Sequence, residues 1–298
     1  MKKLTFIMAI AALALGAYTP KEQNTALEIN NTLSADEIAA ARFTPDVMWK
    51  MGRLGGAALS PDAQTALYTI TRYNMAENRG LTQIYTRDMA TNEERELTDN
   101  TSNNADAQWS ADGKTIYFTS SRSGSTQVWQ MNADGSAAKQ ITDVEGGVEG
   151  YGIAPTGDKI FYIKKVHAAD VKSSDVHKDM DKSQARIYDD LMARHWNYWD
   201  EGEYSHIFVA DLTADGVKND KDILGADAAW DAPLAPYFDV AEIAWSNNGK
   251  MLAYTCKPLT GVEYAISTDS DIFIYNTEDG STLNINKILT NRGMRIME

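Results

Sequence analysis

Cysteine is almost absent from this sequence of 298 residues, which contains Cys256 alone. One cysteine excludes an intrachain disulfide, and it also excludes a zinc site built from two or four cysteines. Cys256 ends the apolar run 251–256, where we expect it to be buried in a strand as a small hydrophobic side chain.

Basic residues are also scarce, since 28 lysines and arginines face 42 aspartates and glutamates and leave a net charge of −14. A nucleic-acid surface needs a basic patch that neutralises phosphates, so we expect no nucleic-acid partner. The sequence lacks both glycine-rich phosphate motifs, G-x-x-x-x-G-K-[ST] and G-x-G-x-x-G, and therefore signals no nucleotide cofactor. Beyond the first residues, no segment approaches the roughly 18 apolar residues of a membrane span.

The first residues predict an export signal. Lys2 and Lys3 precede an apolar stretch, residues 4–17, that ends in small residues. This stretch is too short to cross a bilayer as a helix. We therefore expect residues 1–17 to be a signal peptide and the mature chain to be exported, either periplasmic or secreted.

Two kinds of segment alternate along the rest of the chain. The first has a Ser- or Pro-containing turn with Asp, Asn or Gly and then a hydrophobic strand, as in WSADGKTIYFTSSR. The second is an alternating strand, a polar turn and a short strand, as in QVWQMNADGSAAKQIT. Copies of the first kind begin at Leu59, Trp109, Ile153 and Trp245. Copies of the second kind begin at Gln83, Gln127, His206 and Asp271.

The turns indicate how one repeat folds. Asp112 can bond its own backbone and Gly113 supplies a positive φ at no steric cost, which favours a hairpin. Residues 132–135 form a second such turn, and the alternation in 127–131 indicates a strand with one buried face. Each repeat of roughly 45 residues thus predicts four short antiparallel strands, the blade of a β-propeller.

The predicted fold class is therefore all-β, a partial β-propeller of about four four-stranded blades. The incomplete propeller occupies residues 51–290, after a lead-in segment at 18–50 and before an irregular tail at 291–298. A helical insert at 168–200 lengthens the third blade. The blades are placed at about 51–98, 104–142, 148–224 and 238–289.

Two segments carry helical patterns. Ser34 followed by Glu37 is a capping box, so we expect a short helix within 34–50. In the insert, the segment Ser183–Trp199 has apolar or aromatic residues at i, i+3 and i+4 spacing, which predicts a helix capped by Asp181 or Ser183. The spaced residues are Ile187, Leu191, His195 and Tyr198.

The tandem repeats resemble the TolB-like and WD40-like propellers and the propellers of the prolyl oligopeptidase family of serine peptidases. The third repeat narrows this resemblance. Its run 186–209 contains the pattern Tyr–Asp…Arg-His-Trp…Trp-x-x-Gly…His-x-Phe-Val. This pattern looks like the propeller insert of the acylaminoacyl-peptidase and dipeptidyl-peptidase 5 branch, and the resemblance covers residues 40–290.

Members of this family carry an α/β-hydrolase domain after the propeller, with a Ser nucleophile in a G-x-S-x-G elbow followed by Asp and His. No serine of this sequence has glycine at both −2 and +2, and no alternating βα region occurs. We therefore expect that the catalytic domain and all catalytic residues are absent. The chain would then be a truncated fragment that is inactive alone.

The resemblance implies that acidic and aromatic propeller residues near the hydrolase hold the free amino terminus of a peptide. The candidates in the insert are Trp196, Trp199, Asp200, Glu201 and Glu203. The alternative is that the two tryptophans pack the insert onto the blade and that the carboxylates are solvated. Arg194 and His195 are candidates for a polar latch between insert and blade, and His195 is otherwise a structural histidine.

No metal site and no other cofactor is expected. The spacing of His167 and His177 fits no zinc signature. An acidic turn departs from the spacing of a calcium-binding EF-hand loop and lacks its closing Glu, so turn chemistry explains its aspartates. These aspartates are Asp211, Asp215, Asp220 and Asp222.

Two functions remain open. In the first, the chain is the substrate-gating propeller portion of an exported serine exopeptidase, a dipeptidyl or acylaminoacyl peptidase. Its partners would be peptide substrates and a hydrolase domain. In the second, the chain is a stand-alone TolB-like periplasmic propeller that binds proteins. The Trp-rich insert favours the first function, because TolB-like propellers do not need such an insert.

Overall fold

The computed structural model describes residue 29, residues 31–236 and residues 238–286. The predicted signal peptide at 1–17 and the tail at 291–298 lie outside these residues. Among the described residues, no helix has the length and apolar character needed to cross a membrane.

Within residues 31–50 of the lead-in segment, the structure contains two short helices, α1 (Ala35–Ala40) and α2 (Pro45–Lys50). The predicted capping box is confirmed. The backbone N–H of Glu37 donates to Ser34 Oγ at 3.2 Å, and the backbone N–H of Ser34 donates to Glu37 Oε2 at 2.7 Å. Lys50 of α2 bonds to the same carboxylate at 2.8 Å, so this glutamate ties the two helices together.

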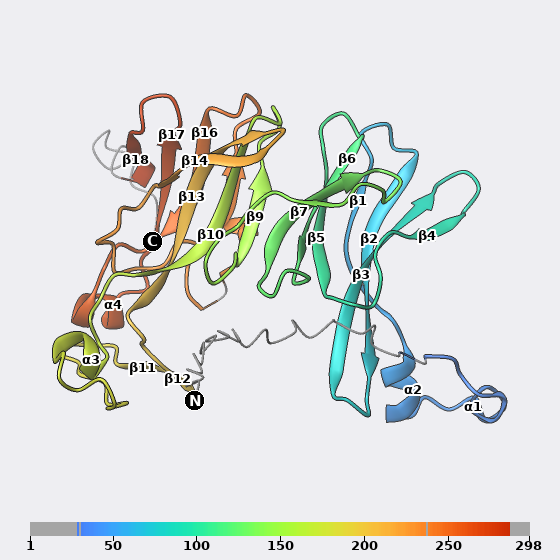
Figure 1. Cartoon of the computed structure of the whole chain (residues 1–298), viewed down its shortest axis with the longest axis horizontal. Coiled ribbons are helices and arrows are strands. Elements are labelled where there is room, and N and C mark those ends of the chain that lie inside the picture. The colour runs from blue at the N-terminus through green and yellow to red at the C-terminus, as the bar shows by residue number, and fades with distance from the viewer. Residues whose placement is uncertain (1–28, 30, 237, 287–298) are drawn as a thin grey trace, which may run out of the picture.

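Four antiparallel four-stranded sheets follow, and they stand side by side in an open arc (Figure 1). Sheet 1 comprises β1 (Arg53–Leu59), β2 (Thr65–Asn74), β3 (Arg79–Asp88) and β4 (Glu94–Glu96). Sheet 2 comprises β5 (Asn104–Trp109), β6 (Thr115–Ser120), β7 (Gln127–Asn132) and β8 (Lys139–Gln140). Sheet 3 comprises β9 (Gly150–Ile153), β10 (Lys159–His167), β13 (Glu203–Thr213) and β14 (Gly216–Asp222). Sheet 4 comprises β15 (Ile243–Trp245), β16 (Met251–Cys256), β17 (Asp271–Asn276) and β18 (Thr282–Asn284).

The predicted fold class, a partial propeller of four-stranded blades, is confirmed by these sheets. Each sheet begins with a hairpin whose turn has the predicted chemistry. In sheet 2, Ser110 Oγ donates to Asp112 Oδ1 at 2.7 Å, and the backbone N–H of Lys114 donates to the same oxygen at 3.1 Å. Gly113 has φ +71°, a conformation that glycine adopts without steric cost. Asn248 takes the place of the aspartate in sheet 4 and accepts the same two bonds.

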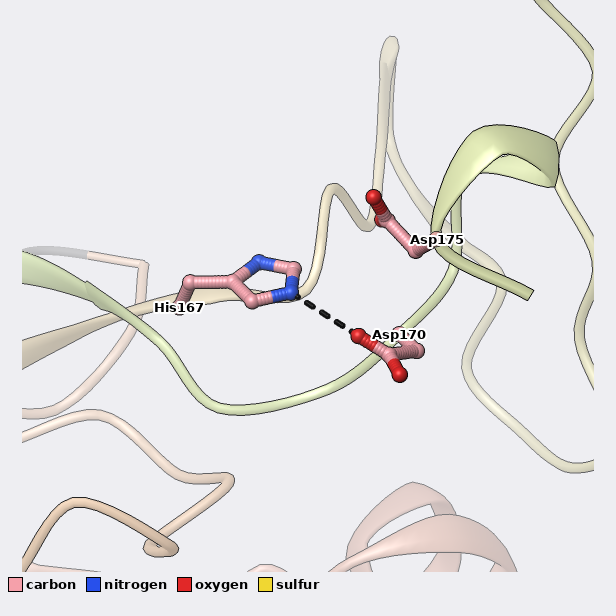
Figure 2. Close-up of side chains that lie close together, drawn as sticks. All are labelled: His167, Asp170 and Asp175. Carbon is pink, nitrogen blue, oxygen red and sulfur yellow. Dashed lines mark hydrogen bonds and ion pairs between the residues drawn. The ribbon is translucent and has the colours of Figure 1, made fainter. Parts of the chain in front are cut away.

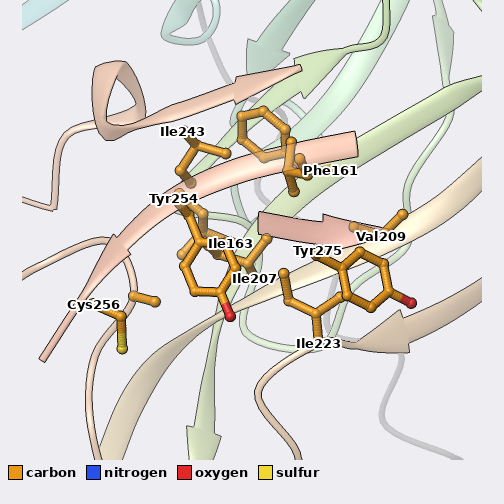
Figure 3. Packing of buried hydrophobic residues seen from close by; sticks show 11 residues of the cluster. Phe161, Ile163, Ile207, Val209, Ile223, Ile243, Tyr254, Cys256 and Tyr275 are labelled. Atoms are coloured by element: carbon orange, nitrogen blue, oxygen red, sulfur yellow. The ribbon is translucent and has the colours of Figure 1, made fainter. Parts of the chain in front are cut away.

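In the described part of the chain, three hydrophobic cores hold the four sheets together, one between each pair of neighbours. Successive side chains of a strand point to opposite faces, so a central strand contributes to two cores. In β6, Ile116 and Phe118 pack toward sheet 1, whereas Tyr117 packs toward sheet 3. The core between sheets 3 and 4 includes the buried thiol of Cys256, as expected for a strand residue (Figure 3).

The insert between β10 and β13 differs from the prediction. Its helix is the single turn α3 (Ser173–Val176), and the predicted helix over Ser183–Trp199 is wrong. That segment instead contains a small hairpin, β11 (Arg194–His195) with β12 (Tyr198–Trp199), whose tip residue Trp196 has φ +50°. Two of the residues with helical spacing, His195 and Tyr198, instead pair across this hairpin, with ring centroids 5.6 Å apart.

The base of the insert is closed by backbone hydrogen bonds. The N–H groups of Ala168 and Ala169 donate to the carbonyl of Gly202, at 2.9 and 3.2 Å. Gly202 has φ +72°, and a Cβ at this position would lie 1.9 Å from the carbonyl oxygen of Ala169. Glycine is therefore required where the insert returns to sheet 3.

Candidate functional site

A pocket of about 360 Å³ lies between three segments at one end of sheets 3 and 4. The insert forms one wall. The connection 223–242 from sheet 3 to sheet 4 forms a second, and the connection between β16 and β17, which contains α4 (Gly261–Ile266), forms the third. Figure 1 shows β11, β12 and α4 on the same side of these two sheets. The pocket therefore brings together residues that lie up to about one hundred positions apart in the sequence, from Lys165 to Tyr264.

Aromatic and acidic side chains dominate the pocket lining. The aromatic residues are Tyr198, Trp199, Tyr204, Trp230, Phe238 and Tyr264. The acidic residues are Asp200, Glu201, Glu203 and Asp231. Aromatic faces and carboxylates both attract cations, so this lining suits a ligand that carries a positive charge.

Four of the five residues predicted from the insert lie in this pocket. They are Trp199, Asp200, Glu201 and Glu203. Trp196 lies outside it at the tip of the β11–β12 hairpin, where its side chain is 77% exposed. The predicted alternative, in which both tryptophans pack the insert onto the blade, does not describe Trp196.

Two of the insert carboxylates have structural partners. Asp200 accepts hydrogen bonds at both oxygens, from the backbone N–H of Gly202 at 2.8 Å and from the Tyr204 hydroxyl at 3.1 Å. Glu201 forms an ion pair with Arg186 across the insert. Glu203 is exposed at the start of β13. The insert carboxylates thus fix the shape of the pocket wall or face the solvent.

Asp231 is a further acidic residue of the pocket, which was not predicted from the sequence, and it enters from the connection between sheets 3 and 4. Its Oδ1 accepts a hydrogen bond from the backbone N–H of Ser205 at 2.7 Å and lies 3.7 Å from Lys165 Nζ. The Lys165 ammonium also donates to Ser205 Oγ at 2.8 Å and lies 3.7 Å from Glu149. One sequence pattern could have indicated this residue. The dipeptide Trp-Asp occurs at 199–200 and again at 230–231, and the two copies lie on opposite walls of the pocket.

Burial changes the acid–base properties of the pocket. Desolvation raises the pKa of the Asp231 carboxyl above its usual range. Burial also raises the pKa values of the Tyr204 and Tyr264 hydroxyls, with a further contribution from nearby carboxylates. Both tyrosines are therefore protonated at neutral pH. The Tyr204 hydroxyl donates its proton to Asp200, whereas the Tyr264 hydroxyl can donate a hydrogen bond to a ligand.

Arg194 and His195 bond within their own hairpin. Arg194 Nε donates to the Trp196 carbonyl at 3.0 Å, and its guanidinium lies 5.5 Å from the centre of the Trp199 ring. His195 Nδ1 lies 3.1 Å from the Tyr198 hydroxyl. These contacts shape the hairpin rather than latching the insert to sheet 3.

One group of three potential metal ligands occurs within the described parts of the chain. The ligand atoms of His167, Asp170 and Asp175 lie within 4.8 Å of one another, and His167 Nε2 is 3.1 Å from Asp170 Oδ1 (Figure 2). His177 is not part of this group. Both His167 and Asp170 are exposed, and such surface groups commonly occur without a metal.

The four aspartates of the acidic turn each have a protein partner. Asp211 bonds to Asn219, Asp215 pairs with Lys218, Asp220 accepts from the Tyr162 hydroxyl, and Asp222 bonds to His206. Their positions are therefore accounted for by contacts within sheet 3.

The arrangement of the sheets defines a propeller protein. Residues 35–193, more than half of the chain, match the family model described as TolB beta propeller domain, and the chain belongs to this family. It is 32% identical over 286 residues to dipeptidyl-peptidase 5 of Porphyromonas gingivalis, which covers 96% of this chain and 40% of that protein. It is also 32% identical over 250 residues to dipeptidyl-peptidase 5 of Porphyromonas endodontalis, which covers 83% of this chain and 35% of that protein.

A solved structure has a similar fold. The acylaminoacyl peptidase of Pyrococcus horikoshii superposes with a TM-score of 0.55 at 15% identity, over 80% of this chain and 32% of that one. These similarities confirm the resemblance to the acylaminoacyl-peptidase and dipeptidyl-peptidase 5 branch. The chain spans 40% or less of the length of the curated relatives described here.

Proposed function

We propose that this chain is the propeller portion of an exported serine exopeptidase and that its pocket receives the end of a short peptide. An α/β-hydrolase domain, linked or separate, would supply the Ser, Asp and His of the reaction. The similarity to dipeptidyl-peptidase 5 over 96% of the chain carries this proposal. The pocket supports it, because its aromatic and acidic lining suits a small cationic group.

The insert residues have two roles in this proposal. Trp199 offers an aromatic face to the peptide, and Asp200, Glu201 and Glu203 keep the wall of the pocket acidic. A propeller that holds one end of the peptide positions the scissile bond, and positioning of this kind lowers the entropic part of the activation barrier. The propeller thereby selects short peptides, which is the gating role.

Binding of the dipeptide Ala-Phe-amide to the full chain tests this proposal by isothermal titration calorimetry. We expect saturable binding that the substitution Trp199→Ala weakens about tenfold, since loss of a cation–π contact in a partly desolvated site costs about 1–2 kcal/mol. Trp196→Ala is the matched control on the same hairpin. Equal affinity of wild type and Trp199→Ala for the dipeptide would show that the peptide does not bind in this pocket.

A second readout addresses catalysis. We expect the chain alone to bind Ala-Phe-p-nitroanilide without releasing nitroaniline. Cleavage by the purified chain would show that it carries its own catalytic residues and is not a gating portion.

A further inference from the structure

The third wall of the pocket, the connection between β16 and β17, has little apolar support of its own. Its helix α4 has six residues, and none of them is buried. Val262 is 50% exposed and Ile266 is 78% exposed, so these two apolar side chains do not anchor the helix to sheet 4. A helix of this length is not stable in isolation. Contacts at its ends therefore set its position.

The start of α4 contacts the insert. Gly261, the first residue of the helix, has φ +59°, and a Cβ at this position would lie 2.0 Å from Asp190 Oδ2. The insert and the helix therefore lie in close contact where these two walls of the pocket meet.

Lys257 holds the other end of α4. It follows β16 directly, and its ammonium donates hydrogen bonds to the carbonyls of Tyr264 and Ser267, both at 3.0 Å. These carbonyls belong to the last turn of the helix and to its C-cap, where carbonyl groups lack partners within the helix. The same ammonium lies 3.6 Å from the centre of the Tyr264 ring, in a cation–π contact. One side chain thus fixes both the backbone and the ring of Tyr264.

The hydroxyl of Tyr264 is available to a ligand. The side chain lines the pocket and is half-buried. The other two tyrosine hydroxyls of the lining are used within the protein, since Tyr204 donates to Asp200 and Tyr198 bonds to His195 Nδ1. Among the residues that the structure describes, none accepts a hydrogen bond from the Tyr264 hydroxyl. The pocket therefore presents a donor that needs an acceptor from the ligand.

We propose that the Tyr264 hydroxyl donates a hydrogen bond to a carbonyl oxygen of the bound peptide, and that Lys257 is the residue that positions this hydroxyl. The inference rests on the proposed function, because it takes the occupant of the pocket to be a peptide. Every peptide carries carbonyl acceptors along its backbone, whatever its side chains are. The contact therefore recognises the peptide backbone, in addition to the attraction of the lining for positive charge.

The physical reason for the role of Lys257 is preorganisation. A donor that is fixed before binding adds a hydrogen bond without a cost in side-chain ordering. Removal of the ammonium leaves two helix carbonyls and one ring face without their partner. The end of α4 then loses its attachment, and the Tyr264 hydroxyl is no longer held at one point of the pocket.

The test measures the affinity of the full chain for Ala-Phe-amide by isothermal titration calorimetry at neutral pH. Tyr264→Phe should weaken binding about fivefold, because it removes one neutral hydrogen bond and keeps the ring. Lys257→Met should weaken binding by at least as much, whereas Lys257→Arg, which keeps a charged donor, should stay within about threefold of wild type. Lys250→Met is the matched control, since Lys250 precedes the same strand and pairs with Glu278.

A double variant separates positioning from general stability. In the Lys257→Met background, Tyr264→Phe should change the affinity by less than about twofold, because the hydroxyl is no longer held against the peptide. An equal loss of affinity from Tyr264→Phe in both backgrounds would show that Lys257 does not position this hydroxyl.

The outcomes separate this inference from the proposed function. If wild type does not bind the peptide, both fail. If wild type and Tyr264→Phe bind equally well, the proposed function stands and Tyr264 is not the donor. Ala-Phe-amide labelled with ¹³C at both carbonyls gives a readout on the ligand. One of the two carbonyl resonances should shift further on binding to wild type than to Tyr264→Phe, and equal shifts with both proteins overturn the inference.

Discussion

His206 shows how one buried polar residue holds a wall of the pocket in place. It is completely buried, with Nδ1 2.8 Å from Asp222 Oδ2 and Nε2 2.8 Å from the Ala228 carbonyl. Asp222 is the last residue of β14, and Ala228 lies in the connection that carries Asp231. The imidazole thus fastens this connection to sheet 3.

Replacement of this side chain should therefore be costly. We expect His206→Leu to lower the free energy of unfolding by about 3 kcal/mol, because it leaves a partly buried carboxylate and a carbonyl without their partner. Urea unfolding followed by circular dichroism measures this loss. His167→Leu, the same change at an exposed position, should cost less than about 0.5 kcal/mol. Equal losses in the two variants would contradict the role given to His206.

At the scale of elements, the glycine at the base of the insert sets how the insert leaves sheet 3. We expect Gly202→Ala to destabilise the chain by about 3 kcal/mol or more, because the new Cβ would overlap the Ala169 carbonyl in addition to the strain of a positive φ. The free energy of unfolding measures this effect.

Gly157→Ala is the matched control for backbone strain. Gly157 has φ +76°, close to that of Gly202, but a Cβ there would meet no atom within 4 Å. Its replacement should cost about 1 kcal/mol. A Gly202→Ala variant as stable as Gly157→Ala would show that the base of the insert can shift.

The elements also show which parts of the structure a sequence can predict. The hairpins were predicted because their chemistry is local: Ser110, Asp112 and Gly113 lie within four residues and bond to one another. The predicted helix over Ser183–Trp199 was wrong because i, i+3 spacing also fits residues that face each other in a tight hairpin, as His195 and Tyr198 do. Asp231 was missed because it meets Lys165 and Ser205 only after the connection 223–242 has folded back onto sheet 3.

At the scale of the whole molecule, each buried core of the described residues lies between two neighbouring sheets, as in a linear array of repeats. Ile116 belongs to the core between sheets 1 and 2, and Leu252 belongs to the core between sheets 3 and 4. Both side chains are completely buried. Their replacement by alanine should cost about 2–5 kcal/mol each.

The sheets in which each substitution raises amide hydrogen exchange show whether the four sheets unfold separately, as in a linear array, or as one cooperative unit. We expect Ile116→Ala to raise amide hydrogen exchange in sheets 1 and 2, and Leu252→Ala to raise it in sheets 3 and 4. Hydrogen exchange followed by mass spectrometry resolves the two patterns. A uniform rise across all four sheets in both variants would mean that the sheets unfold together.

The pocket described above is built from sheet 3 on one side and from the segments that lead into and through sheet 4 on the other. A ligand can bind there only while both sheets keep their relative position. Its binding free energy therefore also stabilises the packing of sheet 3 against sheet 4. By mass action, a ligand at one hundred times its dissociation constant adds about 2.7 kcal/mol to the folded state. Substrate would therefore act on this propeller as a reversible cross-link, which ties together one junction of the arc and leaves the junction between sheets 1 and 2 unchanged.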